Sequence, residues 1–284
     1  MKSCIFCLAR GHPTIDGYKS LRKRNQSLRN NFYDDMIIFH EGNITPEHQT
    51  LMSKETNNLK FIKVSFNETE EKQSLHQLCH RHDDDFLNKS SHIKNYESVR
   101  KGVHFPIGYS HMCNFYTVDW IQYLDDYDWA MRADDDFFIE PNELDSSIFH
   151  TLDSHGFKFG YRVIDCEYHC HSVKTFDKLQ EFIPNYSYNM EHYYSNFGIF
   201  KLDFWRQTHI RDLLDKLTPF IFEFRWGDSP LQAAIIKSFL ENKEICFIDT
   251  FNYTHGSHNL CTKMCKRFSH DTEVNLITKK LDYL

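Results

Sequence analysis

The chain has 284 residues, of which 40% are hydrophobic and 15% aromatic, and its formal charge is −7 at pH 7. This length and composition predict one large buried core, and the excess of acidic residues argues against a nucleic-acid-binding face. No stretch approaches the roughly 18 consecutive apolar residues of a membrane-spanning helix. We therefore expect a compact chain with no membrane span and no nucleic-acid partner, while its oligomeric state is not evident.

The first part of the chain alternates between apolar strands and a helix. Strands are predicted at Cys4–Ala9, Asp35–His40 and Leu59–Phe66, and a helix over residues 20–32. A strand–helix–strand opening is typical of nucleotide-binding α/β folds. The basic run from Arg22 to Asn25 within this helix is interpreted as a solvated face.

The remainder continues this alternation without an internal repeat or a low-complexity linker. Residues 68–100 are polar and rich in histidine, which favours helix and loop, and helical spacing recurs at Met112–Leu124 and Pro230–Leu240. Further strands are predicted at Trp129–Ala133, residues 156–164, Phe197–Leu202 and Cys246–Asp249. These patterns together indicate an α/β fold in a single compact unit.

An acidic triplet, Asp134, Asp135 and Asp136, directly follows the apolar strand WAMRA. An α/β sheet binds its ligand at the carboxyl ends of its strands, where carboxylates two residues apart can hold a divalent cation together with phosphate oxygens. This D-x-D arrangement is typical of glycosyltransferases that use nucleotide sugars, in which the cation neutralises the diphosphate leaving group. A solvated surface turn is the alternative for such a triplet taken alone.

Nine cysteines leave metal binding and disulfide pairing open. An odd number cannot all pair, and five of them lie in apolar segments where free thiols pack well: Cys4, Cys7, Cys79, Cys113 and Cys246. Two C-x-x-x-C pairs have histidines nearby: Cys166 and Cys170, and Cys261 and Cys265, with His169, His171, His255 and His258. These pairs are compatible with a structural zinc site, although the spacing is unusual, or with disulfides in an oxidising compartment.

Sequons for N-glycosylation matter only if the chain enters a lumen. They begin at Asn25, Asn43, Asn67, Asn88, Asn185 and Asn252.

A series of motifs carries a family resemblance. The chain reads YSHMCNF at residues 109–115, YNMEHYYSNFGI at 188–199, LDFWR at 202–206, FEFRWGDSP at 222–230 and YTH at 253–255. In this order and at these spacings the motifs resemble glycosyltransferase family 15, the fungal Golgi α-1,2-mannosyltransferases, which carry YRHMCRF, WRVEPD, FWSNFEI, LDFWRS and ERWGDAP. The resemblance extends from about Cys4 to Cys261, nearly the whole chain.

The resemblance implies a GT-A-type fold, a Rossmann-like mixed sheet flanked by helices, with residues 1–284 forming a single catalytic domain. It implies that residues up to about 140 bind the nucleotide and that residues 141–284 serve the metal and the acceptor. The implied activity is a retaining transfer of mannose from GDP-mannose to a glycan or glycoprotein acceptor, with manganese as the preferred cation.

The family's metal-binding positions map onto Asp134, Asp136 and His255, so this chain has D-D-D where the family has E-P-D. Carboxylate and imidazole ligands suit Mn²⁺, and the departure looks conservative. The residues assigned to the nucleotide are Arg10, Arg132, Asp134, Asn196, Arg225 and Trp226.

Two residues are assigned to catalysis, Tyr109 and Asp228. Tyr109 matches a family residue near the acceptor hydroxyl, but a phenol with its ordinary pKa of about 10 needs a neighbouring charge to act as a base, so positioning is an equal alternative. Asp228, in the W-G-D motif, is expected to bond sugar hydroxyls or to accept the acceptor's proton. It also precedes the helix Pro230–Leu240, where a capping role is expected in any case.

One departure bears directly on the mechanism. The family's F-W-S-N-F-E-I contains a glutamate proposed as nucleophile or as stabiliser of the oxocarbenium-like transition state, and this chain has Gly198 in its place. Three interpretations remain open. Glu191 or Asp228 serves instead; the reaction follows a front-face ion-pair route; or the donor sugar differs or activity is lost.

The sequence therefore favours an enzyme, a metal-dependent glycosyltransferase. The alternatives are a nucleotide-sugar-binding or glycan-binding protein on the same scaffold without catalysis and, with little support, a small zinc-binding interaction protein. The N-terminal apolar run, six residues after a single Lys, is too short for a signal peptide's core. Together with the odd number of free-looking cysteines this favours a cytoplasmic location, and the Golgi lumen is the alternative if an N-terminal anchor has been removed.

Overall fold

The computed structural model describes residues 1–89, 105–141, 143–166, 175–184, 186, 191–255, 258–260 and 276–277. Within these ranges the main sheet has eight strands in the order β13-β10-β6-β9-β4-β1-β2-β3. Its strands are β1 (Ser3–Leu8), β2 (Asp35–His40), β3 (Leu59–Lys63), β4 (Trp129–Ala133), β6 (Phe159–Tyr161), β9 (Phe197–Lys201), β10 (Ile245–Ile248) and β13 (Leu276–Ile277).

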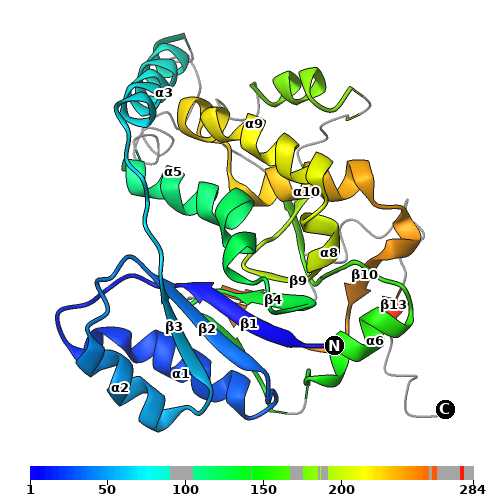
Figure 1. Cartoon of the computed structure of the whole chain (residues 1–284). Helices are drawn as coiled ribbons and strands as arrows, with labels where there is room; N and C mark the ends of the chain where they lie inside the picture. The colour runs from blue at the N-terminus through cyan, green and yellow to red at the C-terminus, as the bar shows by residue number, and fades with distance from the viewer. Residues whose placement is uncertain are drawn as a thin grey trace.

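The sheet is mixed, because β9 runs antiparallel to both of its neighbours, β4 and β6, while the other pairs are parallel. The central strands β1 and β4 carry no polar alternation, as expected for strands covered on both faces. Helices α1 and α2 lie on one face of this part of the sheet, and α5, α9 and α10 lie on the other (Figure 1). The α/β mixed sheet expected from the sequence is therefore confirmed.

Two smaller antiparallel sheets extend from the main one. The first consists of β5 (Phe137–Ile139), β11 (Tyr253–His255) and β12 (His258–Leu260). The second pairs β7 (Ile164–Cys166) with β8 (Glu191–Tyr193).

The α-helices of the described residues are α1 (Lys19–Arg29), α2 (Pro46–Glu55), α3 (Glu70–Lys89), α5 (Ile107–Asn114), α6 (Ser147–Ser154), α8 (Leu202–Trp205), α9 (Thr208–Phe224) and α10 (Asp228–Phe239). Shorter helical turns are η1 (Ile15–Tyr18), η2 (Phe115–Asp119), η3 (Trp120–Tyr123), η4 (Phe176–Glu181) and η5 (Asn242–Glu244). None of the described helices has the length and hydropathy needed to span a membrane.

Two expectations from the sequence need correction. The strand expected at residues 156–164 is divided between β6, in the main sheet, and the start of β7, in the small sheet. The basic run at the centre of α1 is not a wholly solvated face, because Arg24 and Asn25 are buried. The Arg24 guanidinium donates to the Asn25 side chain at 2.8 Å and to the Ala133 carbonyl at 2.7 Å, so it supports the end of β4.

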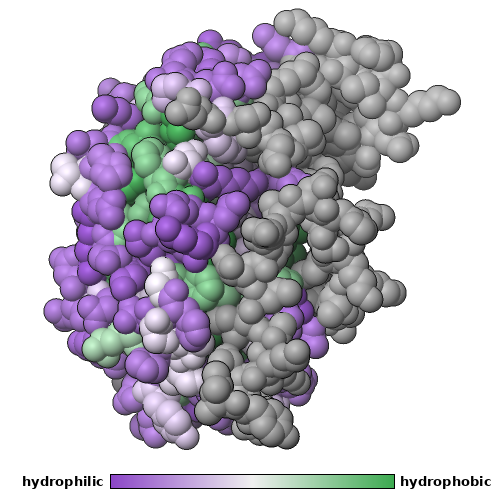
Figure 2. All heavy atoms as spheres, turned by 90° about the vertical axis from the view of Figure 1, so that its right-hand side faces the viewer, coloured by the Kyte–Doolittle hydropathy of each residue, from purple (hydrophilic) through white to green (hydrophobic). Residues whose placement is uncertain are grey.

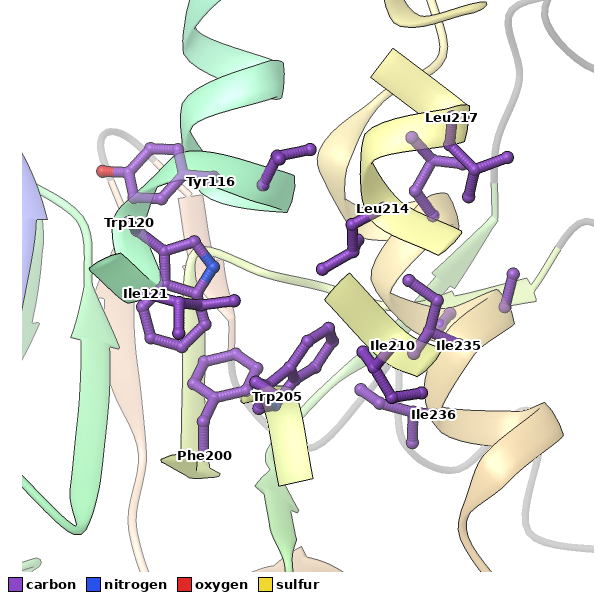
Figure 3. Packing of buried hydrophobic residues seen from close by; sticks show 14 of the residues in the cluster. Tyr116, Trp120, Ile121, Phe200, Trp205, Ile210, Leu214, Leu217, Ile235 and Ile236 are labelled. Carbon is purple, nitrogen blue, oxygen red and sulfur yellow. The ribbon is translucent and has the colours of Figure 1, made fainter. Parts of the chain in front are cut away.

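The largest hydrophobic cluster lies between the sheet and the helices α9 and α10 (Figure 3). Trp120, on η3, is fully buried at its centre and stacks on Phe6 of β1 with ring centroids 4.9 Å apart. It also contacts Phe200 of β9, at 5.3 Å between centroids. The indole thus joins the helical layer to two strands of the sheet.

Large exposed hydrophobic side chains are few among the described residues, namely Met1, Tyr33, Leu51 and Phe239. Figure 2 shows one face on which hydrophilic residues dominate and the hydrophobic ones gather mainly in its upper half. The apolar residues of the described chain are therefore used mostly in the core.

Truncating Trp120 tests this packing. Trp120→Ala should lower the free energy of unfolding by about 3–5 kcal/mol, because it removes a fully buried aromatic ring and leaves a cavity. Urea unfolding monitored by circular dichroism measures the change. Tyr33→Ala, which truncates a ring with 82% of its surface exposed, is the matched control, and its effect should stay within about 0.5 kcal/mol. Equal effects of the two substitutions would contradict the assignment.

Candidate active site

The acidic triplet forms a tight turn between β4 and β5, at the carboxyl end of β4. The backbone N–H of Asp134 donates to the Asn196 carbonyl at 3.1 Å, and the N–H of Phe137 donates to the Asp134 carbonyl at 3.1 Å. β5 then pairs antiparallel with β11, which places Phe137 opposite His255. Strand pairing therefore brings a histidine from far along the chain next to the triplet.

The three side chains assigned to the metal lie close together. Nε2 of His255 is 3.0 Å from Oδ1 of Asp136 and 3.9 Å from Oδ2 of Asp134. The hydrogen bond from His255 lowers the pKa of Asp136. Burial would lower the pKa of His255, but the hydrogen bond and the charges of both carboxylates raise it instead. His255 and Asp136 thus stabilise each other's charged forms.

This arrangement is not a ready-made metal cage. In the described ranges no three His, Cys, Asp or Glu side chains are placed as a metal cluster, and the imidazole bonds directly to Asp136. The chemistry of the donors nevertheless fits a cation such as Mn²⁺, since they are two carboxylates and one imidazole. A cation would have to replace the contact between His255 and Asp136.

Asp135, the middle residue of the triplet, lies where negative charges are concentrated. Burial, together with the neighbouring charges of Asp134 and Asp136, raises the pKa of Asp135 to about 6. A carboxyl group whose ionisation is opposed by two like charges is stabilised by a nearby cation. This observation supports the fit of the site to a divalent ion.

A cavity of about 540 Å³ adjoins the triplet. Asp135 and Asp136 line it together with Arg10, which follows β1. The sequence had assigned Arg10 to the nucleotide, and its place in this cavity is compatible with that prediction. The structure adds His12 and Tyr18, from the segment between β1 and α1, and Glu41, which follows β2; the sequence had singled out none of them.

Arg132 is buried between two carboxylates. Its Nε donates to Oδ1 of Asp134 at 2.9 Å, and its Nη1 donates to Asp228 and, at 3.1 Å, to Oγ of Ser195. The guanidinium carbon lies 3.4 Å from the centre of the Tyr116 ring. The sequence assigned Arg132 to the nucleotide. In the structure its contacts instead hold Asp134 and Asp228 in position.

Asp228 is the first residue of α10, and its expected capping role is wrong. The N-cap position is Gly227, and no side-chain hydrogen bond caps the helix. The Asp228 carboxylate turns instead toward Arg132 and accepts a hydrogen bond of 2.8 Å from Ser195. Burial alone would raise the pKa of Asp228, but the charge and hydrogen bonds of Arg132 and Ser195 outweigh it and lower this pKa.

Tyr109 lies on α5 beside Cys113 and the Asp228 carboxylate. The neighbouring Cys113, burial and the charge of Asp228 all raise the pKa of Tyr109 far above its ordinary value. Its ring packs against Phe105 with centroids 4.6 Å apart. The phenol therefore stays protonated, which favours the positioning role over proton abstraction.

The other residues assigned to the nucleotide differ in their surroundings. Asn196 is buried, and its Oδ1 accepts a hydrogen bond from Tyr253 at 3.0 Å while its Nδ2 has no partner among the described residues. Trp226 is fully buried, stacks on Phe176 and donates to Thr175 at 2.8 Å. Asn196 thus has a free donor to offer a ligand, whereas Trp226 contributes through packing.

Arg225, also assigned to the nucleotide, has a left-handed backbone with a φ of 52°. Its guanidinium lies over the Phe105 ring, with 4.4 Å between the guanidinium carbon and the ring centre. This geometry places Arg225 beside the start of α5, near the ring that packs on Tyr109.

The position of the missing glutamate is closed. Gly198 of β9 pairs with Arg132 of β4, so both residues project toward the same face of the sheet. A Cβ atom at Gly198 would come within 2.8 Å of the Phe200 ring and 3.4 Å of the Phe159 ring. An aromatic ring therefore occupies the space into which a side chain at this position would extend.

The five cysteines expected to be free are buried, and none of them forms a disulfide within the described ranges. The proposed zinc or disulfide residues of the second pair, Cys261 and Cys265, lie outside the described residues, as do Cys170, His169 and His171. The side chains of Cys166 and His258 are likewise not described. Both alternatives for this set stay predictions.

Comparison with known proteins gives a consistent result. A family model described as "Glycolipid 2-alpha-mannosyltransferase" matches residues 172–275. "Glycolipid 2-alpha-mannosyltransferase 2" of Candida albicans is 25% identical over 92% of this chain and 60% of its own length. "Probable mannosyltransferase KTR3" of Saccharomyces cerevisiae is 31% identical over 55% of this chain and 44% of its own length. The chain thus spans only part of these relatives.

Solved structures share the fold. The mannosyltransferase Ktr4p of S. cerevisiae in complex with GDP has a TM-score of 0.72 at 15% identity, over 92% of this chain and 72% of that one. Core-mannan synthase A of Aspergillus fumigatus, in its Mn/GDP form, has a TM-score of 0.69 at 16% identity, over 90% of this chain and 74% of that one. The expected fold and the family resemblance indicated by the motifs are both confirmed.

Removing Arg132 tests the buried charge cluster. Arg132→Met should lower the free energy of unfolding by about 3–5 kcal/mol, because it leaves buried carboxylates without a compensating charge. Urea unfolding at neutral pH measures the loss, and the double variant Arg132→Met/Asp228→Leu should recover part of it.

The matched control is Arg22→Met, since Arg22 forms an ion pair with Glu55 near the surface. This control should cost at most about 1 kcal/mol. If Arg132→Met cost no more than the control, Arg132 would not compensate a buried charge.

Proposed function

We propose that this chain is a member of the glycolipid 2-alpha-mannosyltransferase family, glycosyltransferase family 15, and moves mannose from GDP-mannose to a hydroxyl of a glycan or glycoprotein with the help of Mn²⁺. The observation that carries the proposal is the meeting of Asp134, Asp136 and His255 beside the cavity at the carboxyl end of the sheet. The printed descriptions of two related structures include GDP, and one of them also includes Mn.

In this proposal the cation is held by Asp134, Asp136 and His255 and neutralises the charge that develops on the diphosphate leaving group. Arg10, on the wall of the same cavity, supplies a positive charge to the nucleotide. The unpartnered Nδ2 of Asn196 supplies a further hydrogen-bond donor. The other residues of the site then position and orient the two substrates.

The absence of a carboxylate at Gly198 favours a route in which the leaving group departs on the face that the acceptor attacks. Asp228 is one alternative to the missing carboxylate. Arg132 compensates the negative charge of Asp228, and the pKa of Asp228 is lowered. A carboxylate stabilised in this way is a weak nucleophile. Glu191, the other alternative, lies on β8 of the small sheet, apart from the strand β9 that carries Gly198. The acceptor is then oriented by Asp228 and Tyr109.

A second function has one observation in its favour. The ring of Phe200 fills the space beside Gly198, and a scaffold that binds nucleotide sugar or glycan without catalysis would be compatible with this replacement. A transferase with a different donor sugar is a further form of the same alternative.

The assignment of residues up to about 140 to the nucleotide, and of residues 141–284 to the metal and the acceptor, stays a prediction with partial support. All of the residues that line the cavity beside the triplet come from the first 140 residues, whereas Asp228 and His255 come from the later part.

The compartment also stays a prediction, cytoplasmic or Golgi lumen. In a lumen the sequon at Asn25 would not be modified in the folded chain because Asn25 is buried, while Asn43, Asn67 and Asn252 are exposed.

Substitution of Asp136 tests the metal site. Asp136→Ala should reduce Mn²⁺-dependent release of GDP from GDP-mannose at least about 100-fold, because it removes a metal ligand. Asp126→Ala, an exposed aspartate in the turn before β4, should leave release unchanged. Release from another nucleotide sugar would contradict the assignment of the donor. No turnover of any donor, with nucleotide binding intact, would favour the binding protein.

Tyr109→Phe separates positioning from proton abstraction. A phenol whose pKa is raised is not a base at neutral pH, so the variant should retain the rate to within about tenfold and keep the pH profile of the wild type. Initial rates of transfer measured from pH 5 to 9, with Tyr33→Phe as the surface control, provide the comparison. A loss of more than about 100-fold together with a changed basic limb would show that Tyr109 is the base.

A further inference from the structure

The cavity beside the triplet continues past β1 to the end of β2, where Glu41 lies on its wall. Glu41 is exposed, and no hydrogen bond or ion pair engages its carboxylate within the described residues. Apolar side chains of Leu8, Phe66 and Met112 line other parts of the same cavity. A carboxylate without a partner in a partly apolar cavity is suited to a flat ligand with hydrogen-bond donors at its edge.

The backbone around Glu41 is fixed before any ligand binds. Gly42 has a φ of 87°, in the left-handed region, and its N–H donates to Nδ1 of His40 at 3.0 Å. A Cβ atom at Gly11 would lie 2.2 Å from the Asn43 carbonyl oxygen, so the segment after β1 is pressed against the turn that follows β2. These contacts hold the turn that carries Glu41 in one position.

The opposite side of the cavity is equally constrained. A Cβ atom at Gly17 would come within 2.5 Å of His12, and the Tyr18 hydroxyl accepts the backbone N–H of His12 at 2.8 Å. The rings of His12 and Tyr18 pack edge to face with centroids 4.9 Å apart. The cavity is thus bounded by two rigid loops rather than by mobile side chains.

Strand order locates Glu41 relative to the metal ligands. Asp134 and Asp136 follow β4, β1 pairs with β4, and β2 pairs with β1. Because neighbouring strands lie about 4.8 Å apart, Glu41 is displaced by two strands, or roughly 10 Å, from the acidic triplet. In dinucleotide-binding sheets an acidic residue one strand away from the phosphate site holds a ribose hydroxyl. A residue two strands away is placed for the base.

We propose that Glu41 selects a guanine nucleotide by accepting two hydrogen bonds, from N1–H and from the N2 amino group of the base. Both donors lie side by side on guanine, and a carboxylate accepts such a pair with its two oxygens. Adenine has an acceptor at N1, and uracil has a single donor between two carbonyl oxygens. Either base would turn an acceptor toward Glu41, so the carboxylate would discriminate against both.

The inference rests on the proposed function, in which the donor is a nucleoside diphosphate sugar, and direct binding tests it without turnover. Titration calorimetry with Mn²⁺ compares GDP, inosine diphosphate, which lacks the N2 amino group, and 2′-deoxyguanosine diphosphate. The proteins are the full chain, Glu41→Gln and the control Glu47→Gln, which changes an exposed glutamate of α2 outside the cavity.

Glu41→Gln should weaken GDP binding about 10- to 100-fold, as expected when a hydrogen bond to a charged group is lost. The wild type should bind inosine diphosphate about tenfold more weakly than GDP, and this difference should disappear in Glu41→Gln. Removing the 2′-hydroxyl should have the same effect on both proteins, and Glu47→Gln should behave as the wild type.

Two results would overturn the assignment of Glu41 while leaving the proposed function intact. The first is GDP binding by Glu41→Gln that is as tight as in the wild type. The second is loss of the effect of the 2′-deoxy ligand in Glu41→Gln, which would place Glu41 at the ribose. If the wild type bound none of the three nucleotides, the proposed function and the role of Glu41 would both fall.

Discussion

The structure depends on one buried interaction, the contact of Arg132 with Asp134 on one side and Asp228 on the other. Arg132 is the penultimate residue of β4, Asp134 follows the same strand, and Asp228 begins α10. Removing these charges from water is costly, and the cost is offset only because each hydrogen-bonds to a partner. The Tyr116 ring, stacked on the guanidinium, completes the enclosure from η2. The end of the central strand and the start of a helix are thereby held in one relative position.

A second constraint is the pairing of β5 with β11, which fixes His255 against Asp136. The turn formed by the acidic triplet is held at both ends, because the strand before it, β4, and the strand after it, β5, are both paired with other strands. The residues proposed as metal ligands are therefore positioned by strand pairing, and the Asp228 carboxylate is positioned by an ion pair. The two parts of the site meet at Asp134, which takes part in both arrangements.

Local sequence patterns predicted the strands β1, β2, β4, β9 and β10 and the helix α10 because each has a clear apolar periodicity. Two features were beyond such patterns. Arg24 occurs in a basic run that reads as solvated, and only the tertiary contact with the Ala133 carbonyl shows that it is buried. Asp228 stands at the start of a helix, where capping residues are common, but its carboxylate binds Arg132 and does not cap the helix. α9 was not predicted at all, although its burial pattern is strongly one-sided.

For the site, the motifs identified the residues but not their roles. They marked Arg132 and Trp226 as ligand contacts, whereas the geometry makes the first a support for two carboxylates and the second a part of the core. They gave no sign of Glu41, because a single glutamate after a strand has no distinctive spacing. Its importance follows only from the order of the strands.

Gly198, which stands where the resembled family has a glutamate, shows how a single residue limits the chemistry that this fold can support. The glycine allows the Phe200 ring to approach β9, and the same ring contacts Trp120 and Trp205 in the core. Restoring a carboxylate would require this ring to move, so the loss of the side chain and the packing of the core are linked. The remaining carboxylate near Arg132 is neutralised by it. In the proposed function, the transfer would therefore depend on the departure of the diphosphate at the acidic triplet rather than on a nucleophile on β9.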